Sequence, residues 1–285
     1  MKRKFRKTNQ VLVAEPTFSL QKKALEEKER DLKEKEKRIS DRERLVDTDR
    51  KVLEDTLHEI RKINNQIKGN ILELEKLIDG HIEEDGYSER HIKNALKTID
   101  GNSSLLSIRM DAYDILYNPA SINTELDLMI GVYSKIEKVY KCLYSSKKEK
   151  NLDIILKGGS EKKFRLRNSI ELAFFIIIEN AIKYSPEDDE ITISFQETDS
   201  DLRVQFQNWG ICPALEEMPL LTHRGFRSSS VSDNTNYSGS GLGLYLLDQI
   251  CHTNHVDYTI NVDESYKYYK GLKYNPFVVS LQFKD

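Results

Sequence analysis

The amino-acid sequence predicts an α+β protein in which a long helical region precedes an α/β sandwich. Apolar residues recur at helical spacing through the first part of the chain, and the pair Asn118-Pro119 then interrupts this pattern. Beyond that pair, stretches typical of strands and of helices alternate, as in a layered sheet domain. We therefore expect a basic tail, a coiled-coil helix, a helical hairpin and an α/β domain, over residues 1–19, 20–57, 58–119 and 120–285.

A coiled-coil seam is expected between residues 20 and 82, where the chain contains no proline and only two glycines. Apolar side chains recur there every seven residues, at Leu25, Leu32, Ile39, Val46, Leu53, Ile60, Ile67 and Leu74. The second row of seam positions is polar upstream, whereas downstream it holds Leu57, Ile71 and Ile78 around a single Asn64. The seam should therefore be weak upstream and strong downstream, with Asn64 fixing its register.

A second amphipathic helix is expected over residues 89–117, with Ser88 as its N-cap and Asn118-Pro119 as its end. The stretch from Gly101 to Ser103 is a weak point in its helical pattern. Two helices joined by a short loop form a hairpin, and two hairpins that dimerise through their first helices form a four-helix bundle. We therefore expect a homodimer held together by the N-terminal helices.

The remaining residues predict a sandwich of strands and helices. A strand is expected at residues 122–130, followed by a helix at 131–150 and another strand at 152–158. Ser169 should cap a helix that reaches Lys183. Two strands are expected at residues 190–196 and 202–208, followed by a Ser/Asn/Gly-rich loop at 227–241 and a helix at 242–251. Two further strands are expected at 257–263 and 276–283.

Composition excludes several functional classes. The 285 residues carry a net charge of −3 with 32% charged residues and a mean hydropathy of −0.60, so nothing indicates nucleic-acid binding. The longest apolar run, residues 172–178, is far shorter than a membrane span, and the VLVA stretch near the basic N-terminus is too short for a signal peptide. Three well-separated cysteines favour a reducing, cytoplasmic location.

A phosphate-binding turn is indicated by GSGLGL at residues 239–244, which lies where a loop meets a helix. Glycines let the backbone approach a phosphate, and a helix N-terminus offers free N–H groups. Asn180 and Lys183 lie three residues apart on one predicted helix face, where they are suited to Mg²⁺ and to a phosphate. Taken singly, these signals also fit a tight turn and a polar outer stripe on a core helix.

The order of four short motifs resembles the GHKL ATPase superfamily, and within it the sensor histidine kinases, over residues 122–285. ENAIKYS is similar to the N box, NWG to a variant G1 box, GFR to the F box and GSGLGL to the G2 box. The resemblance implies that Asn180 holds Mg²⁺ and that ATP is bound under a lid at residues 212–238. The implied ATP-binding residues are Asn180, Lys183, Tyr184, Asn208, Gly210, Phe226, Arg227, Gly239, Gly241, Leu242 and Gly243.

Two positions depart from the family pattern. Asn208 stands where the G1 box usually carries the Asp that accepts a hydrogen bond from the adenine amino group. An amide oxygen accepts the same bond without charge, so we expect an affinity lower by about 1 kcal/mol. Ile176 stands where the gyrase, Hsp90 and MutL branches carry a hydrolytic Glu. A clamp driven by ATP hydrolysis therefore lacks its expected base.

The HEIR motif resembles the H box, which carries the phosphoacceptor histidine of these kinases. His58 follows the seam residue Leu57, so it should face solvent, and Glu59 is suited to accept a proton from its imidazole. Two residues depart from the H box: Ile63 replaces the family's proline, and Lys62 replaces the Thr or Asn typical of members that also act as phosphatases. A solvated histidine on a charged helix remains the alternative interpretation.

These inferences lead to one expected function and one rival. The expected protein is a dimeric histidine kinase that uses ATP-Mg²⁺ to phosphorylate His58 and passes the phosphoryl group to a response-regulator receiver domain, without nucleic acid or a membrane span. The rival is a GHKL switch on a coiled-coil scaffold, which regulates a partner without phosphotransfer. A metal site at Cys251, His252 and His255 is a further alternative.

Overall fold

The computed structural model describes residues 14–78, 87–118, 125–232, 237 and 239–284. The chain divides into two compact units, Met1–Val52 and Leu53–Asp285, which are described separately. The second unit contains both a helical part and a sheet domain, so the predicted α+β class is confirmed. No helix in the described ranges combines the length and apolar character that crossing a bilayer requires.

The described part of the first unit is the N-terminal portion of helix α1 (Ala14–Ile78). The helix begins at Ala14, six residues before the expected start of the coiled coil. Three residues of the predicted seam, Leu25, Leu32 and Ile39, are 59%, 58% and 57% exposed. This portion of α1 therefore leaves its apolar row uncovered within a single chain.

In the second unit, α2 (Tyr87–Tyr117) follows the end of α1 and runs without a break through Gly101. A Cβ atom at Gly101 would lie 3.7 Å from the Cα atom of Cys142 in α4 (Val132–Cys142), so the glycine allows close packing of the two helices. Ile108 and Ile115 of α2 are buried and belong to the same apolar core as the sheet domain. The stretch at Gly101, expected to weaken the helix, is thus the place where α2 packs against α4.

The main sheet has the strand order β2-β4-β5-β8-β6, and β7 (Lys267–Tyr269) pairs with β8 off this path. Its strands are β2 (Asp153–Lys157), β4 (Glu190–Glu197), β5 (Asp201–Gly210), β6 (Asp257–Val262) and β8 (Leu272–Lys284). Only the β2–β4 pair is parallel among these strands, and the others are antiparallel. A separate antiparallel pair joins β1 (Leu128–Gly131) to β3 (Lys163–Leu166).

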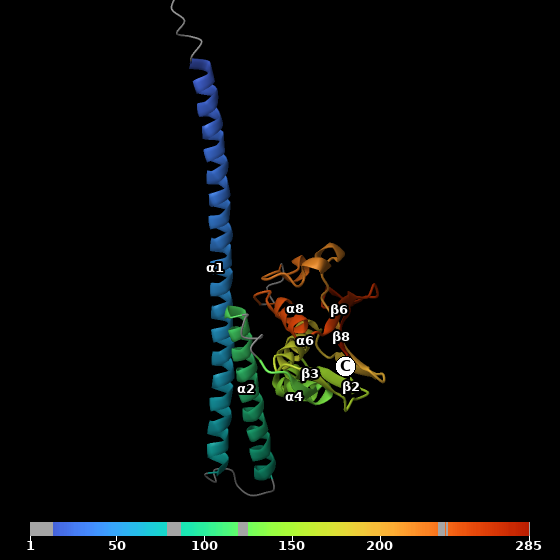
Figure 1. Cartoon of the computed structure of the whole chain (residues 1–285). Coiled ribbons are helices and arrows are strands. Elements are labelled where there is room, and N and C mark those ends of the chain that lie inside the picture. Colours follow the sequence, from blue (N-terminus) through green and yellow to red (C-terminus); the bar gives the residue numbers. More distant parts are fainter. Residues whose placement is uncertain (1–13, 79–86, 119–124, 233–236, 238, 285) are drawn as a thin grey trace, which may run out of the picture. The chain divides into compact units, whose positions relative to one another are not determined.

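A layer of helices covers one face of this sheet. The helices α4, α6 (Ile170–Tyr184) and α8 (Gly243–Thr253) pack side by side, and α6 lies against β5 (Figure 1). Alternate residues of β4 and β5 point into the core, where Ile193, Val204 and Phe206 are buried. The α/β sandwich predicted from the sequence is therefore confirmed.

Several elements differ from those expected. The helix predicted over residues 131–150 is divided into α4 and α5 (Tyr144–Glu149) at Leu143, which is buried. Of the strand predicted over residues 122–130, residues 128–130 belong to β1, residues 125–127 are not in a strand, and residues 122–124 lie outside the described part. The short strands β3 and β7 were not predicted from the sequence.

Candidate nucleotide-binding site

Helix α6 carries the first two site residues near its C-terminal end. Its apolar run from Leu172 to Ile178 is buried, which fixes the helix between the sheet and the neighbouring helices. Asn180 and Lys183 follow this run at partly exposed positions, three residues apart, as the sequence predicted. The helix ends at Tyr184, and the residue that caps it, Ser185, has an extended backbone with a φ of −71° and a ψ of 149°.

The glycine turn before α8 has a conformation that glycine alone adopts without strain. Gly239 and Gly241 have φ angles of +150° and +71°. A Cβ atom at Gly241 would lie 2.5 Å from the carbonyl oxygen of Phe226, so no other residue fits there. The backbone N–H of Gly225 donates to the carbonyl oxygen of Gly241 at 3.1 Å. The GFR and GSGLGL motifs are therefore in direct contact.

The same turn contacts the polar residues of α6. A Cβ atom at Gly239 would lie 2.7 Å from Lys183 Nζ, and one at Gly243 would lie 3.5 Å from Asn180 Nδ2. The ammonium group of Lys183 therefore lies at the glycine turn, while Asn180 lies beside the first residue of α8. A cation, an amide, an open backbone turn and a helix N-terminus in one place fit a triphosphate with its Mg²⁺.

Asn208 lies near the end of β5 and is buried, with 6% of its surface exposed. Its Nδ2 atom donates to Ser185 Oγ and to the carbonyl oxygen of Trp209, each at 3.1 Å. A Cβ atom at Gly210 would lie 3.2 Å from the same Nδ2 atom, so the glycine leaves room for the amide. The G1 and N box residues are thereby joined at the end of α6.

Aromatic and cationic side chains lie next to these polar groups. Tyr184 packs against Tyr237, with ring centroids 5.5 Å apart, and Lys183 Nζ lies 5.1 Å from the Tyr184 ring centroid. The guanidinium of Arg227 donates to the carbonyl oxygen of Tyr237. Burial raises the pKa of the Tyr184 hydroxyl, and the charge of Arg227 partly opposes this rise. Tyr184 and Arg227 are therefore near neighbours.

Two residues at the predicted site, Leu242 and Ile176, have buried apolar side chains. Leu242 precedes α8 and is 4% exposed, so its side chain belongs to the core and any contact with a phosphate would come from its backbone. Ile176 is also buried, and its Cγ2 atom would lie 3.4 Å from a Cβ atom at Gly243. A methyl group of Ile176 therefore lies beside the glycine turn, and this position carries no carboxylate that could act as a base for ATP hydrolysis.

The predicted acceptor, His58, lies on α1 within the second unit and is exposed, as expected from its place beside the seam. The side chain of Glu59 lies outside the described residues. A cluster of His, Cys, Asp or Glu side chains able to hold a metal is absent from the described part of the chain, so the alternative at Cys251, His252 and His255 gains no support.

The structure adds residues to the site that the sequence did not indicate. Ser185 is 1% exposed and accepts a hydrogen bond from Asn208. Its place at the end of the ENAIKYS motif is a sequence signal that could have identified it as a site residue. Tyr237 is brought onto Tyr184 by the fold, and no local pattern marks it. Glu179, the residue before Asn180, forms an ion pair with Arg109 of α2.

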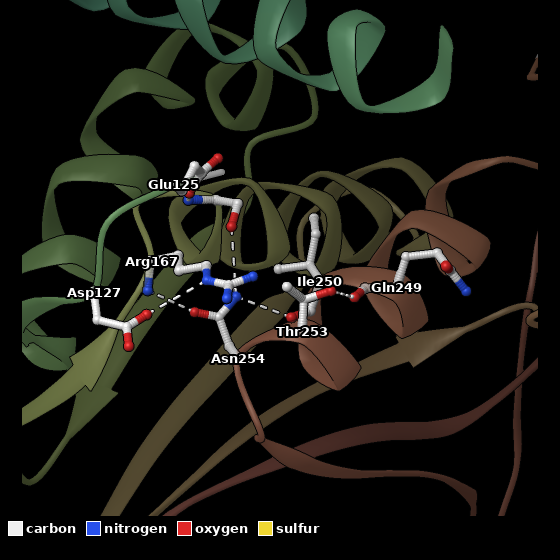
Figure 2. Close-up of polar contacts among 8 residues, drawn as sticks. Glu125, Asp127, Arg167, Gln249, Ile250, Thr253 and Asn254 are labelled. Carbon is white, nitrogen blue, oxygen red and sulfur yellow. Dashed lines mark hydrogen bonds and ion pairs between the residues drawn. The ribbon is translucent and has the colours of Figure 1, made fainter. Parts of the chain in front are cut away.

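A buried asparagine anchors the far end of α8. Asn254 accepts a hydrogen bond from the Arg167 backbone N–H at 2.7 Å and donates to the Ile250 carbonyl oxygen at 2.9 Å (Figure 2). Arg167 Nε also lies 3.4 Å from Asp127 Oδ1. Because α8 starts at the glycine turn, this anchor helps to fix the position of the helix N-terminus.

Known protein families match the part of the chain that contains the candidate site. Residues 166–283 match the family described as histidine kinase-, DNA gyrase B- and HSP90-like ATPase. The chain is 29% identical over 104 residues to the histidine protein kinase SaeS of Staphylococcus aureus strain USA300. That alignment covers 35% of this chain and 29% of the SaeS sequence, so the chain matches less than a third of its relative's length.

Solved structures with a similar fold include the catalytic domain of histidine kinase ThkA, at 19% identity and a TM-score of 0.44. The ThkA alignment covers 55% of this chain and 95% of that domain. The Acinetobacter baumannii histidine kinase AdeS aligns at 18% identity with a TM-score of 0.40, covering 80% of this chain and 97% of the chain in that structure.

The ATPase family match includes every motif that the structure brings together, from the end of β3 to β8. The curated relative adds the class of enzyme in which this type of domain occurs. Residues 166–283 of this chain form a domain of the histidine kinase-, DNA gyrase B- and HSP90-like ATPase family and are similar to a histidine kinase member.

Proposed function

We propose that this chain is an ATP-dependent protein-histidine kinase, which phosphorylates its own His58 and passes the phosphoryl group to an aspartate of a response-regulator receiver domain. The observation that carries the proposal is the meeting of four motif segments around the C-terminal end of α6, in a domain of the ATPase family. Lys183 and the glycine turn would hold the phosphates, and Asn208 would face the adenine. Asn180 would hold Mg²⁺, which would offset the negative charge of the phosphates.

In the proposed reaction, one imidazole nitrogen of His58 attacks the γ-phosphorus of ATP. The bond from this phosphorus to the β–γ bridging oxygen breaks, ADP leaves, and Glu59 accepts the proton from the other imidazole nitrogen. An aspartate oxygen of the receiver domain then attacks the same phosphorus, the nitrogen–phosphorus bond breaks, and Glu59 returns the proton to the leaving imidazole. The exposure of His58 supports both steps, because the imidazole must reach ATP and the partner in turn.

We also propose that the working protein is a homodimer joined along α1. Leu25, Leu32 and Ile39 repeat every seven residues and are each more than half exposed in the single chain. A second copy offers an identical row, and burial of the two rows against each other would remove this apolar surface from water. The domain division that goes with this proposal is a coiled coil over residues 20–57, a phosphoacceptor hairpin over 58–119 and the ATP domain over 120–285.

The proposal places the kinase in the cytoplasm, where ATP is available and free thiols remain reduced. The thiols of Cys142, Cys212 and Cys251 are all unpaired, and the structure buries Cys142 and Cys251. This agrees with an enzyme that works in a reducing compartment.

A second function is favoured by one observation on α1. Ile63 stands at the position of the H box proline, and it is 8% exposed within an unbroken helix. A helix that continues here presents His58 on a straighter surface than a proline-containing segment would. The alternative is therefore an ATP-binding switch that regulates a partner through its helices without phosphotransfer.

Labelling with γ-³²P-ATP distinguishes the two functions. The kinase should acquire acid-labile, alkali-stable label, as expected for phosphohistidine, and His58→Gln should abolish it with ATP affinity unchanged. His252→Gln is the matched control, because His252 is an exposed histidine at the far end of α8. Stable ATP binding with no label on the unmodified chain would support the switch instead, and full labelling of His58→Gln would contradict the acceptor assignment.

The metal assignment has its own test. Asn180→Ala removes the proposed Mg²⁺ ligand, so the gain in ATP affinity that Mg²⁺ provides in calorimetry should be lost. Asn168→Ala is the control, since Asn168 is an exposed asparagine before the same helix. An undiminished Mg²⁺ effect in Asn180→Ala would show that the metal is held elsewhere.

A further inference from the structure

The orientation of the Asn208 amide is fixed by the acceptors around it. Ser185 Oγ lies 2.7 Å from the carbonyl oxygen of Ala181, which has no proton to donate. The single hydroxyl proton of Ser185 must therefore lie between these two oxygens. Only lone pairs of Ser185 Oγ remain for Asn208, so the Asn208 atom at 3.1 Å must be the amide nitrogen.

A second acceptor leads to the same orientation. The backbone carbonyl oxygen of Trp209 lies 3.1 Å from the same Asn208 atom and also has no proton to offer. The two protons of the Asn208 amide are thus both used, one by Ser185 and one by Trp209. An inverted amide would place its oxygen against two sets of lone pairs, which is unfavourable.

The amide oxygen of Asn208 is left for a ligand. Among the described residues, none donates a hydrogen bond to Asn208 Oδ1. In the same part of the chain, Asn102 Nδ2 is the one fully buried side-chain nitrogen or oxygen without a partner, so Asn208 Oδ1 must retain contact with solvent. Asn208 thus has one polar atom without a protein partner among the described residues, Oδ1, and this atom can only accept a hydrogen bond.

We propose that Ser185 is a positioning residue that sets base specificity, by holding Asn208 so that only its carbonyl oxygen faces the nucleotide base. This inference rests on the proposed ATP site. A carbonyl oxygen accepts a hydrogen bond from the 6-amino group of adenine and opposes the 6-oxo group of hypoxanthine or guanine. Asn208 therefore retains the selectivity expected of an aspartate without its charge, and this selectivity depends on Ser185.

The test compares Mg²⁺-ATP with Mg²⁺-ITP, whose base carries oxygen in place of the 6-amino group, by calorimetry. The unmodified protein should prefer ATP, and Ser185→Ala should lower the ratio of the two affinities by about tenfold, the effect of one neutral hydrogen bond. Ser134→Ala is the matched control, because the Ser134 hydroxyl also bonds a backbone carbonyl, that of Gly131, outside the site. Its ratio should remain that of the unmodified protein.

A double variant separates amide rotation from general loosening. In Ser185→Ala with Asn208→Asp, a carboxylate has no proton to present, so the preference for ATP should return even if both affinities are weaker. A ratio unchanged by Ser185→Ala, or one not restored in the double variant, would overturn the inference while ATP binding persists. Failure of the unmodified chain to bind either nucleotide would instead overturn the ATP site itself.

A measurement on the unmodified protein tests the geometry even if Ser185→Ala does not fold. The side-chain NH₂ protons of Asn208, identified in ¹⁵N spectra by their loss in Asn208→Asp, should exchange slowly with water in the absence of nucleotide. Both protons should remain protected when ATP is added. Exchange as fast as that of the exposed Asn261 amide would show that the amide is not held, and the inference would fail.

Discussion

The ATP domain and the N-terminal portion of α1 differ in how far their apolar residues are buried. In the domain, the run from Leu172 to Ile178 is buried between the helices and the sheet. In α1, Leu25, Leu32 and Ile39 remain exposed along the helix. The domain therefore completes its own core, whereas this portion of the helix leaves its apolar row uncovered, as the proposed dimer requires. ATP binding by the domain should therefore not require a second chain, whereas the N-terminal portion of α1 should depend on the proposed dimer.

The largest expected effect breaks the helical side of this comparison. Replacing Leu25, Leu32 and Ile39 together by serine should raise the dimer dissociation constant by more than a thousandfold, measured by sedimentation equilibrium. Burial of each side chain is worth roughly 1 kcal/mol at a half-empty seam, and a dimer contains each position twice. ATP affinity and the melting temperature of the sheet domain should not change.

The control for this variant replaces polar residues on the outer face of the helix by serine, at Glu27, Arg30 and Lys37. Because these positions face away from the predicted seam, the dissociation constant should stay close to that of the unmodified protein. An equal loss of dimer in the control, or none in the seam variant, would contradict the pairing along this row.

The next effect is on the phosphate end of the ATP domain. Gly241→Ala should weaken ATP binding at least hundredfold in calorimetry, because its Cβ atom would lie 2.5 Å from the Phe226 carbonyl oxygen in a strained backbone conformation. Gly271→Ala is a close control, since Gly271 has a φ of +79° but nothing within 4 Å of its Cβ position. Equal losses in the two variants would mean that backbone strain, not crowding at the site, causes the effect.

A smaller effect concerns the anchor at the end of α8. Asn254→Ala leaves the Arg167 N–H without its buried acceptor, so the free energy of unfolding in urea should fall by about 1–3 kcal/mol. Asn261→Ala is the control, because Asn261 is exposed and its side chain donates a 3.3 Å hydrogen bond to Thr259 Oγ1 on the same strand. No change in Asn254→Ala would argue that water replaces the amide without loss.

The smallest effect is a dependence of stability on pH. Burial of Glu171 favours its neutral form, but hydrogen bonds from Lys135 and Lys138 outweigh this and lower the pKa of the carboxyl. Such a group stabilises the fold above its unfolded pKa, about 4.3, and the contribution is lost as pH falls through the folded value. Glu171→Gln should therefore lose less than about 1 kcal/mol at pH 7 and show a flatter acid dependence. An unchanged slope of unfolding free energy with pH below 5 would contradict this.

The sequence predicted those features that depend on local pattern. The helix through Asn180 and Lys183, the glycine turn from Gly239 and the exposed place of His58 all follow from the spacing of neighbouring residues. Strand β7 was missed because its three residues form a strand only by pairing with β8. The role of Ser185 was missed for a related reason, since its partner Asn208 lies 23 residues away on another element. Long-range pairing of this kind leaves no periodic signal.

Departures from the family pattern were easier to see than to interpret. From the sequence, Asn208 is expected to be a weaker substitute for an aspartate, and its surroundings give it a defined orientation that the sequence alone does not indicate. Ile63 replaces the proline of the family pattern, and its burial within α1 accounts for an apolar residue there. In both cases the three-dimensional neighbours decide what the substitution means.

The place of β8 in the sheet has a consequence for synthesis of the protein. This strand follows all the others in the sequence, yet it lies between β5 and β6 and pairs with both. Asn208 and Gly210 at the site are held in register with Phe277 and Asn275 of this strand. The sheet cannot close while β8 is still inside the ribosome, and such late, distant pairings fold slowly. A product that stops before β8 would lack an ordered nucleotide site, so interrupted translation should yield no fragment that binds ATP.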